Sequence, residues 1–284
     1  MSPVTALWTE LEQRLLPVFA DYRGRLAELP IEVKADRTLL TEADIAVQAL
    51  IVDAIRAVDP DAVVIAEEDE RTGPREEVRT SQGRIWVVDP IDGTAEFVQS
   101  GHVEFCSVVC LLEDWQPAAA FVLAPELGSG GTPILVTADA RTGDLHLNGQ
   151  RVQSPAEASG WLSATRSAGA DPEDFDEAAR KAGFTLKTRT TSQTVDMLRT
   201  AVDIEARTGP PLPRFDLFWR REQKLWDGAA GLCLSTAAGL RSCDEHGDAL
   251  PLGPEFLSAP TPTFASTVTG RPETVVWFLE AVQA

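Results

Sequence analysis

The first sixty residues carry apolar positions at the spacing of an α-helix. Apolar residues recur every three or four positions over residues 4–29 and again up to Val58, which predicts two amphipathic helices. The second helix has a start signal, because Thr41 is a favourable N-cap and the acids Glu42 and Asp44 follow in the first turn. We therefore expect one helix over residues 4–29 and another that begins at Thr41.

Two β-branched runs come next, and each ends in carboxylates. Residues 62–66 lead directly into an acidic run that begins at Glu67, and residues 85–88 lead into Asp89-Pro90-Ile91-Asp92-Gly93-Thr94. A residue before proline is biased away from helix and towards extended geometry, so the second strand is expected to stop at Asp89.

The end of this second strand predicts a cation site. Asp89 and Asp92 lie three positions apart across a proline-stiffened turn, so their oxygens can be directed at one point. Gly93 lets the backbone turn sharply and expose its amide. A site with oxygen ligands only favours Mg²⁺, Mn²⁺ or Ca²⁺.

The rest of the chain alternates short strands and helices. Residues 71–83 are polar and are expected to form a surface loop, and residues 207–221, rich in proline and glycine, an irregular connection. Further strands are predicted at residues 103–112, 118–123, 133–138, 160–165, 184–188 and 240–243, and further helices at residues 172–182, 194–202, 229–238 and 272–282. Strand–helix alternation in the second half indicates an α/β fold.

Composition and charge exclude several classes of function. The chain has 284 residues, enough for one large core or two tightly joined halves. Its formal net charge of −19 repels nucleic acids and anionic membranes. No apolar run approaches the roughly 18 residues that a membrane span needs. We expect a cytoplasmic protein with no nucleic-acid polymer and no membrane as partner.

Cysteines and histidines do not predict a zinc or redox site. The four cysteines form no CxxC pair and are expected to be buried thiols, and the three histidines have no HxxxH spacing. The glycine-rich and serine motifs of P-loop enzymes and serine hydrolases do not occur. Acids at the ends of structured elements are therefore the main candidates for chemistry.

Four motifs occur in order along the chain: Thr41-Glu42-Ala43-Asp44, Ala66-Glu67-Glu68, Trp86-Val87-Val88-Asp89-Pro90-Ile91-Asp92-Gly93-Thr94 and Trp226-Asp227-Gly228-Ala229-Ala230-Gly231. Their order and wording resemble the magnesium-dependent, lithium-sensitive phosphatase superfamily that includes inositol monophosphatase, fructose bisphosphatase and the bisphosphate nucleotidases. The resemblance implies a layered α/β/α/β/α fold with two halves, residues 1–150 with most metal ligands and residues 151–284 with Asp227 and the substrate contacts. A homodimer is also implied by the resemblance alone.

The resemblance also implies a role for each acid. It implies two or three Mg²⁺ ions held by Glu67, Asp89, the backbone carbonyl of Ile91, Asp92 and Asp227. Thr94 and Asp44 would orient or deprotonate the attacking water, and Glu67 would share in catalysis. The backbone amides of Gly93 and Thr94 would hold phosphate oxygens.

The short run Asp92-Gly93-Thr94-Ala95-Glu96-Phe97 is similar to the bacterial 3′(2′),5′-bisphosphate nucleotidase branch. Adenosine 3′,5′-bisphosphate is therefore the leading substrate, while inositol phosphate, another sugar or polyol phosphate, and histidinol phosphate stay open. Arg220 or Arg221 is a candidate contact for a second phosphate on the substrate, and a solvated charge is the alternative for either. A fold that has lost turnover and serves as a regulatory scaffold is the alternative from another class.

Overall fold

The computed structural model describes residues 3–34, 39–69, 73–166 and 174–283. Its helices are α1 (Pro3–Gly24), α2 (Glu42–Val58), α3 (Glu76–Thr80), α4 (Thr94–Phe97), α5 (Asp174–Lys181), α6 (Gln193–Ala201), α7 (Leu225–Ala237), α8 (Pro254–Leu257) and α9 (Pro272–Gln283), with 3₁₀ turns at Leu26–Glu28 and Glu205–Arg207. Its strands are β1 (Ile31–Val33), β2 (Leu39–Thr41), β3 (Val64–Ala66), β4 (Ile85–Asp92), β5 (Cys106–Glu113), β6 (Gln116–Gly128), β7 (Thr132–Asp139), β8 (Asp144–Leu147), β9 (Gln150–Arg151), β10 (Trp161–Arg166), β11 (Thr185–Arg189), β12 (Leu217–Lys224), β13 (Arg241–Cys243) and β14 (Thr263–Gly270).

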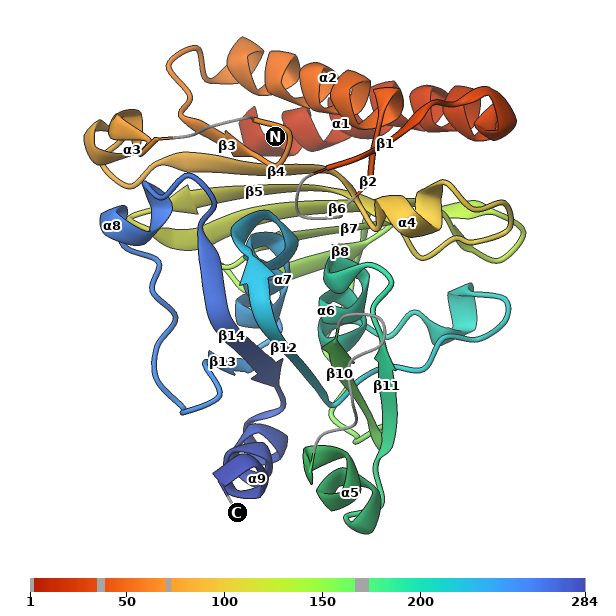
Figure 1. Cartoon of the computed structure of the whole chain (residues 1–284), viewed down its shortest axis with the longest axis vertical. Coiled ribbons are helices and arrows are strands. Elements are labelled where there is room, and N and C mark those ends of the chain that lie inside the picture. The colour runs from red at the N-terminus through yellow and green to blue at the C-terminus, as the bar shows by residue number, and fades with distance from the viewer. Residues whose placement is uncertain (1–2, 35–38, 70–72, 167–173, 284) are drawn as a thin grey trace.

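These elements stack in five layers. Helices α1 and α2 cover the outer face of a seven-stranded sheet with the strand order β3-β4-β5-β6-β7-β8-β9. Helices α6 and α7 lie between that sheet and a five-stranded sheet with the order β11-β10-β12-β14-β13, whose far face carries α5 and α9 (Figure 1). This is the predicted α/β/α/β/α arrangement.

Three apolar clusters hold the layers together. The outer cluster joins α1 and α2 to the first sheet and includes Leu11, Ile51 and Phe121. The central cluster packs α6 and α7 between the two sheets, and a third joins α5 and α9 to the second sheet. All four cysteines are buried free thiols, as predicted. Each layer is thus fixed by apolar burial, at about 25 cal/mol per Å² of apolar surface removed from water.

The alternation of side chains along β4 decides which way its acids face. Trp86 and Val88 belong to the outer cluster, whereas Ile85 and Val87 belong to the central one. Because successive side chains point to opposite faces of a strand, Asp89 continues the series of Ile85 and Val87. Its carboxylate is therefore directed at α6 and α7.

The structure corrects the expected end of this strand. Strand β4 does not stop at Asp89 but continues to Asp92, because Asp89 pairs with Val108 and Asp92 with Cys106 across a register irregularity. Pro90 lacks an amide to donate, and its carbonyl instead accepts a 2.9 Å hydrogen bond from Ser107 Oγ.

Two segments predicted as irregular also contain regular structure. Residues 71–83 include α3, which is anchored by the buried Val78, so a plain surface loop was wrong; Arg71 and Thr72 lie outside the described residues. Residues 207–221 run into β12, whose polar second half pairs with β14, a strand that was not predicted. The first two residues of the helix expected from Pro172 also lie outside the described part; the helix is described from Asp174.

Candidate metal centre

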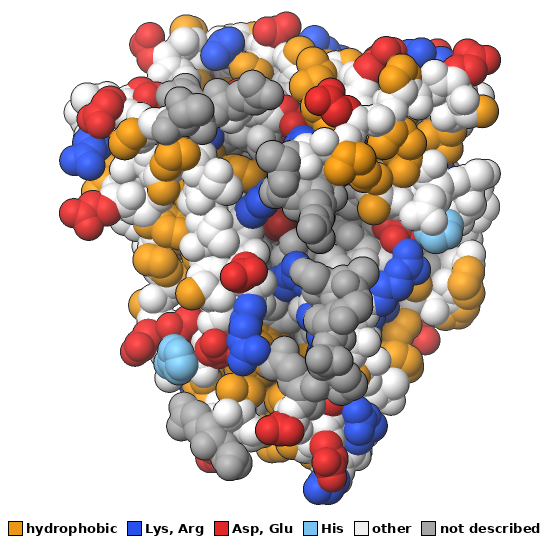
Figure 2. All heavy atoms as spheres, in the orientation of Figure 1, with side chains coloured by type: hydrophobic (Ala, Val, Ile, Leu, Met, Phe, Trp, Pro, Cys, Tyr) orange, Lys and Arg blue, Asp and Glu red, His pale blue; other side chains and the backbone are white. Residues whose placement is uncertain are grey.

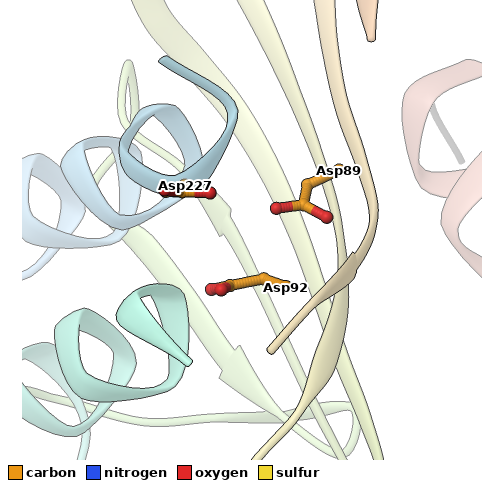
Figure 3. Close-up of side chains that lie close together, drawn as sticks. All are labelled: Asp89, Asp92 and Asp227. Atoms are coloured by element: carbon orange, nitrogen blue, oxygen red, sulfur yellow. The ribbon is translucent and has the colours of Figure 1, made fainter. Parts of the chain in front are cut away.

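Three aspartates from two elements meet between the sheets. Asp89 and Asp92 extend from the end of β4 towards Asp227, which lies in the first turn of α7 (Figure 3). One carboxylate oxygen from each lies within 4.8 Å of the other two. Like charges this close repel one another, so the arrangement needs either protons or a cation to be stable.

Asp89 supplies the strongest sign of a cation. Its side chain is 0% exposed, and neither carboxylate oxygen has a hydrogen-bond partner in the described part of the chain. A buried polar atom without a partner carries a desolvation penalty of about 1–3 kcal/mol, and a charged one more. A hard divalent ion would supply the missing partner, so these residues fit the Mg²⁺ that the sequence predicts.

Asp92 is held in place by the start of α6. Its Oδ2 accepts hydrogen bonds from Ser192 Oγ at 2.7 Å and from the Thr194 amide at 2.6 Å, and its Oδ1 accepts one from the Gln193 amide at 3.3 Å. Helix N-termini present unpaired amides and favour negative charge. The first half of the chain thus provides the acid, and the second half fixes its direction.

Asp227 is oriented by the same turn of α6. Gln193 Nε2 donates to Asp227 Oδ2 at 2.7 Å, and Thr194 Oγ1 donates to the Asp227 backbone carbonyl at 2.9 Å. Gln223 in turn donates to Gln193 Oε1 at 3.2 Å. These hydrogen bonds fix the position of Asp227. Among the described residues, they come from neutral groups and do not neutralise its charge.

Glu67 lies beside the three aspartates. Its amide donates to the carbonyl of Val88 at 3.1 Å, which continues the β3–β4 pairing up to the acid. Lys34 Nζ lies 3.3 Å from Glu67 Oε1 and 2.6 Å from Glu68 Oε2. Glu70, the last acid of this predicted run, lies outside the described residues.

Burial, joined at some positions by neighbouring negative charge, raises the pKa values of the four acids. Burial is the main cause at Glu67, Asp89, Asp92 and Asp227, and it raises the pKa of each carboxyl above its ordinary value, with Asp89 and Asp227 raised furthest. The charge of Glu67 is the second cause at Asp89, and the charge of Asp92 the second cause at Asp227. Clustered groups with shifted pKa values are typical of functional sites.

Thr94 and Asp44 form a hydroxyl–carboxylate pair next to this cluster. Thr94 Oγ1 lies 3.3 Å from Asp44 Oδ1 and 3.0 Å from the carbonyl of Ile91. A hydroxyl has one proton, so it donates to only one of these acceptors at a time. When it donates to Asp44, the Ile91 carbonyl is left with its lone pairs available.

Asp44 is itself fixed by a capping box at the start of α2. Its Oδ2 accepts hydrogen bonds from the amide of Thr41 at 2.7 Å and from the Thr41 hydroxyl at 2.6 Å. Asp44 is 0% exposed, and burial raises its pKa to about 6. Its carboxyl group can therefore exchange a proton near neutral pH.

Gly93 makes the turn from β4 into α4. Its φ of 91° lies in the left-handed region, and a Cβ at this position would lie 3.1 Å from the Glu104 carbonyl and 3.3 Å from Ser192 Cβ. Any other side chain would be strained and crowded here. The role of the Gly93 and Thr94 amides in holding phosphate stays a prediction.

The two arginines predicted on the substrate side point in different directions. Arg220 is partly buried and donates to Thr190 Oγ1 at 3.0 Å, whereas Arg221 is exposed and pairs with Glu245 at 2.7 Å. Burial lowers the pKa of the Arg220 guanidinium, and the negative charge of Asp227 opposes that effect. The structure thus brings Arg220 near the acids and does not bring Arg221 there.

Sequence reasoning missed the residues that orient the ligands. Ser192, Gln193 and Thr194 hold Asp92 and Asp227, and Lys34 pairs with Glu67. The available signal was a serine before a predicted helix, which is an N-cap pattern. Its partner could not be read from the sequence, because Asp92 and Ser192 lie 100 positions apart.

The five layers, together with carboxylates collected at the end of a central strand, define an α/β protein with a candidate oxygen-ligand metal site. The family model for the Inositol monophosphatase family matches residues 1–274, so this chain belongs to that family. The predicted resemblance and fold are thereby confirmed.

Named relatives point to phosphatases. The 3′(2′),5′-bisphosphate nucleotidase CysQ of Escherichia coli (strain K12) is 41% identical over 98 residues, which are 34% of this chain and only 38% of that protein. A histidinol-phosphatase of Chlorobaculum parvum is 32% identical over 151 residues, 49% of this chain and 56% of the relative. These curated relatives therefore match this chain over little more than half of their own length at most.

A solved structure of the same fold covers nearly the whole chain. The crystal structure of an IMPase/NADP phosphatase, complexed with Mg²⁺ and phosphate, matches with a TM-score of 0.77 and 18% identity over 99% of this chain and 95% of that one. In the part of the chain that is described, no helix is both long and apolar enough to cross a membrane.

Proposed function

We propose that this protein is a Mg²⁺-dependent phosphomonoesterase that removes the 3′-phosphate of adenosine 3′,5′-bisphosphate. The observation that carries the reaction class is Asp89, whose buried and unpartnered carboxylate faces Asp92 and Asp227. Membership of the Inositol monophosphatase family supports it. The substrate rests on the 41% identity with a bisphosphate nucleotidase over about a third of the chain.

Different residues of the chain would bind the metal and orient its ligands. Glu67, Asp89, the carbonyl of Ile91, Asp92 and Asp227 would hold Mg²⁺, with Ser192 and Gln193 keeping two of the aspartates in position. Bound Mg²⁺ would supply charge neutralisation of the phosphate and a lowered pKa of the attacking water.

Thr94 and Asp44 would accept the proton that the attacking water loses. The Thr94 hydroxyl donates to Asp44, so a lone pair on Thr94 Oγ1 is available to a water molecule on its other side. The proton lost by that water then passes through Thr94 to Asp44, whose pKa of about 6 suits a group that must accept it near neutral pH. The backbone amides of Gly93 and Thr94 would hold the phosphate oxygens.

A panel of phosphate esters tests this proposal. Phosphate release is measured in Mg²⁺ for adenosine 3′,5′-bisphosphate, inositol 1-phosphate and histidinol phosphate, and the substrates are ranked by kcat/KM. We expect the bisphosphate to rank first. Histidinol phosphate in first place would support the second candidate, which rests on the longer 151-residue match.

The inactive-scaffold alternative makes a different prediction in the same assay. A scaffold would release no phosphate from any ester in the panel. The close approach of Asp89, Asp92 and Asp227 argues against it, because unneeded clustered carboxylates destabilise a fold.

A further inference from the structure

Arg220 and Arg221 are neighbours on β12 but lie on opposite faces of the second sheet. Phe218 belongs to the central cluster between the sheets, whereas Trp219 belongs to the third cluster, with α5 and α9. Side chains alternate along a strand, so Arg220 shares the inner face of Phe218 and Arg221 the outer face of Trp219. Consistent with this, the Arg221 guanidinium lies 4.8 Å from the centre of the Trp219 ring.

Some N–H donors of the Arg220 guanidinium lack a hydrogen-bond partner among the described residues. Among the described residues its one side-chain hydrogen bond goes to the neutral hydroxyl of Thr190, at 3.0 Å from Nη1, and its buried Nε has no partner. Burial lowers the pKa of this guanidinium and the charge of Asp227 opposes that effect. A guanidinium has five N–H donors in a fixed fork, so most of its binding capacity is unused by neutral partners.

Thr190 holds the arginine from a fixed position. Its Oγ1 donates to the carbonyl of Arg166, at the end of β10, at 2.9 Å and accepts from Arg220. The guanidinium is therefore tied to the end of the second sheet that faces the three aspartates. Figure 2 shows several Lys and Arg side chains gathered towards the middle of this face of the molecule.

A cation in this place suits a substrate with two phosphates. Mg²⁺ on the carboxylates would accept the phosphate that is cleaved, and a second phosphate on the leaving group would need a separate positive partner outside the metal ligands. Arginine recognises phosphate through parallel N–H donors, which gives more geometric specificity than lysine.

We infer that Arg220 binds the second, uncleaved phosphate of the substrate and so selects a bisphosphate over a monophosphate. The inference rests on the proposed function, because it assumes that the leaving group is a nucleotide. The competing role is structural: Arg220 would act only as a counter-charge to Asp227, and its loss would then affect every substrate alike.

The experiment compares two substrates that share the bond to be cleaved. Adenosine 3′,5′-bisphosphate and adenosine 3′-monophosphate differ only in the 5′-phosphate. Steady-state kinetics are measured in Mg²⁺ for the wild type, Arg220→Ala, Arg220→Lys and the control Arg221→Ala, after thermal denaturation has shown that each variant is folded.

Arg220→Ala is expected to raise KM for the bisphosphate about 10- to 100-fold, because the variant loses one or two hydrogen bonds to a charged group. Its kcat should change less than about threefold. Its kcat/KM for the monophosphate should stay near the wild-type value. Arg220→Lys should fall between the two, because it keeps the charge and loses the fork. Arg221→Ala should resemble the wild type with both substrates.

Two results would overturn the inference alone. Equal losses on both substrates would assign Arg220 the structural role, and wild-type kinetics of Arg220→Ala with both substrates would show that Arg220 does not contact the substrate. If Arg220→Ala does not fold, the lysine variant decides between the same outcomes. A wild type that shows no preference for the bisphosphate would instead refute the proposed substrate, and the inference with it.

Discussion

The hydroxyl of Ser192 donates a 2.7 Å hydrogen bond to Asp92 and thereby joins the start of α6 to the end of β4. The same hydroxyl accepts a 3.0 Å hydrogen bond from the amide of Val195, as an N-cap does. One buried side chain therefore caps a helix of the second half and orients an acid of the first. Helix formation and the geometry of the acid cluster are linked at this point.

Substitution of Ser192 by alanine should weaken both functions. We expect a loss of about 1–2 kcal/mol in the free energy of unfolding, since the cap is removed, and weaker Mg²⁺ binding, since Asp92 loses a donor. Urea denaturation and a Mg²⁺ titration followed by calorimetry measure the two effects. Ser258→Ala is the matched control, because Ser258 is also buried but donates to the Glu255 carbonyl away from the site. Equal Mg²⁺ affinity in Ser192→Ala and the control would contradict the link.

Asp89→Asn should stabilise the metal-free protein at neutral pH. The folded-state pKa of Asp89 is raised, so the folded chain binds a proton more tightly than the unfolded chain. By linkage, stability is greatest below the ordinary carboxyl pKa and is lost as pH rises towards the raised value. Removal of this buried, unpartnered charge should therefore add about 1–3 kcal/mol at pH 7.5 in a chelator, and less at pH 5. Thermal denaturation at both values checks the sign.

Mg²⁺ should reverse that order of stability. The wild type should gain stability with rising Mg²⁺, as any ligand of the folded state produces, whereas Asp89→Asn should gain much less. Asp53→Asn, a change at an exposed position on α2, should behave like the wild type. The same Mg²⁺ gain in Asp89→Asn as in the wild type would show that Asp89 is not a ligand.

Gly231→Ala should destabilise the packing of α6 against α7. A Cβ at Gly231 would lie 2.4 Å from Met197 Sδ and 2.6 Å from Met197 Cβ, so the two helices would have to separate or the methionine shift. Overpacking of this kind costs about 1–3 kcal/mol, which chemical denaturation can detect. Gly24→Ala is the control, since a Cβ there meets no atom within 4 Å, and it should change stability by less than about 0.5 kcal/mol. Equal stability of both variants would mean that α6 and α7 pack more loosely than described.

Two of the candidate acids lie in local patterns that the sequence alone shows. Asp44 lies in a capping box that begins at Thr41, and Asp89 follows an apolar run that is typical of a buried strand. Such patterns depend on neighbours in the chain. The convergence of Asp227 with Asp89 and Asp92, by contrast, came only from the family resemblance.

The errors arose where pairing across long distances decides structure. The second half of β12 reads Arg-Arg-Glu-Gln-Lys, which has no apolar alternation, and it is extended because it pairs with β14 about 40 positions later. Strand β14 itself is rich in threonine and small residues and lacks a strong apolar signal. The start of α6 was predicted as a helix, but its hydrogen bonds to Asp92 and Asp227 depend on contacts that no local pattern contains.

Release of phosphate from an ester by this protein should require Mg²⁺ bound at the cluster of Asp89, Asp92 and Asp227. Phosphate release from adenosine 3′,5′-bisphosphate is measured in a chelator and then with added Mg²⁺, for the wild type, Asp227→Asn and the exposed control Asp248→Asn. We predict no release in the chelator, saturable recovery with Mg²⁺ in the wild type and the control, and a loss of more than about 100-fold in Asp227→Asn. Release that persists in the chelator, or an Asp227→Asn variant as active as the wild type, would show that this cluster is not a catalytic metal site.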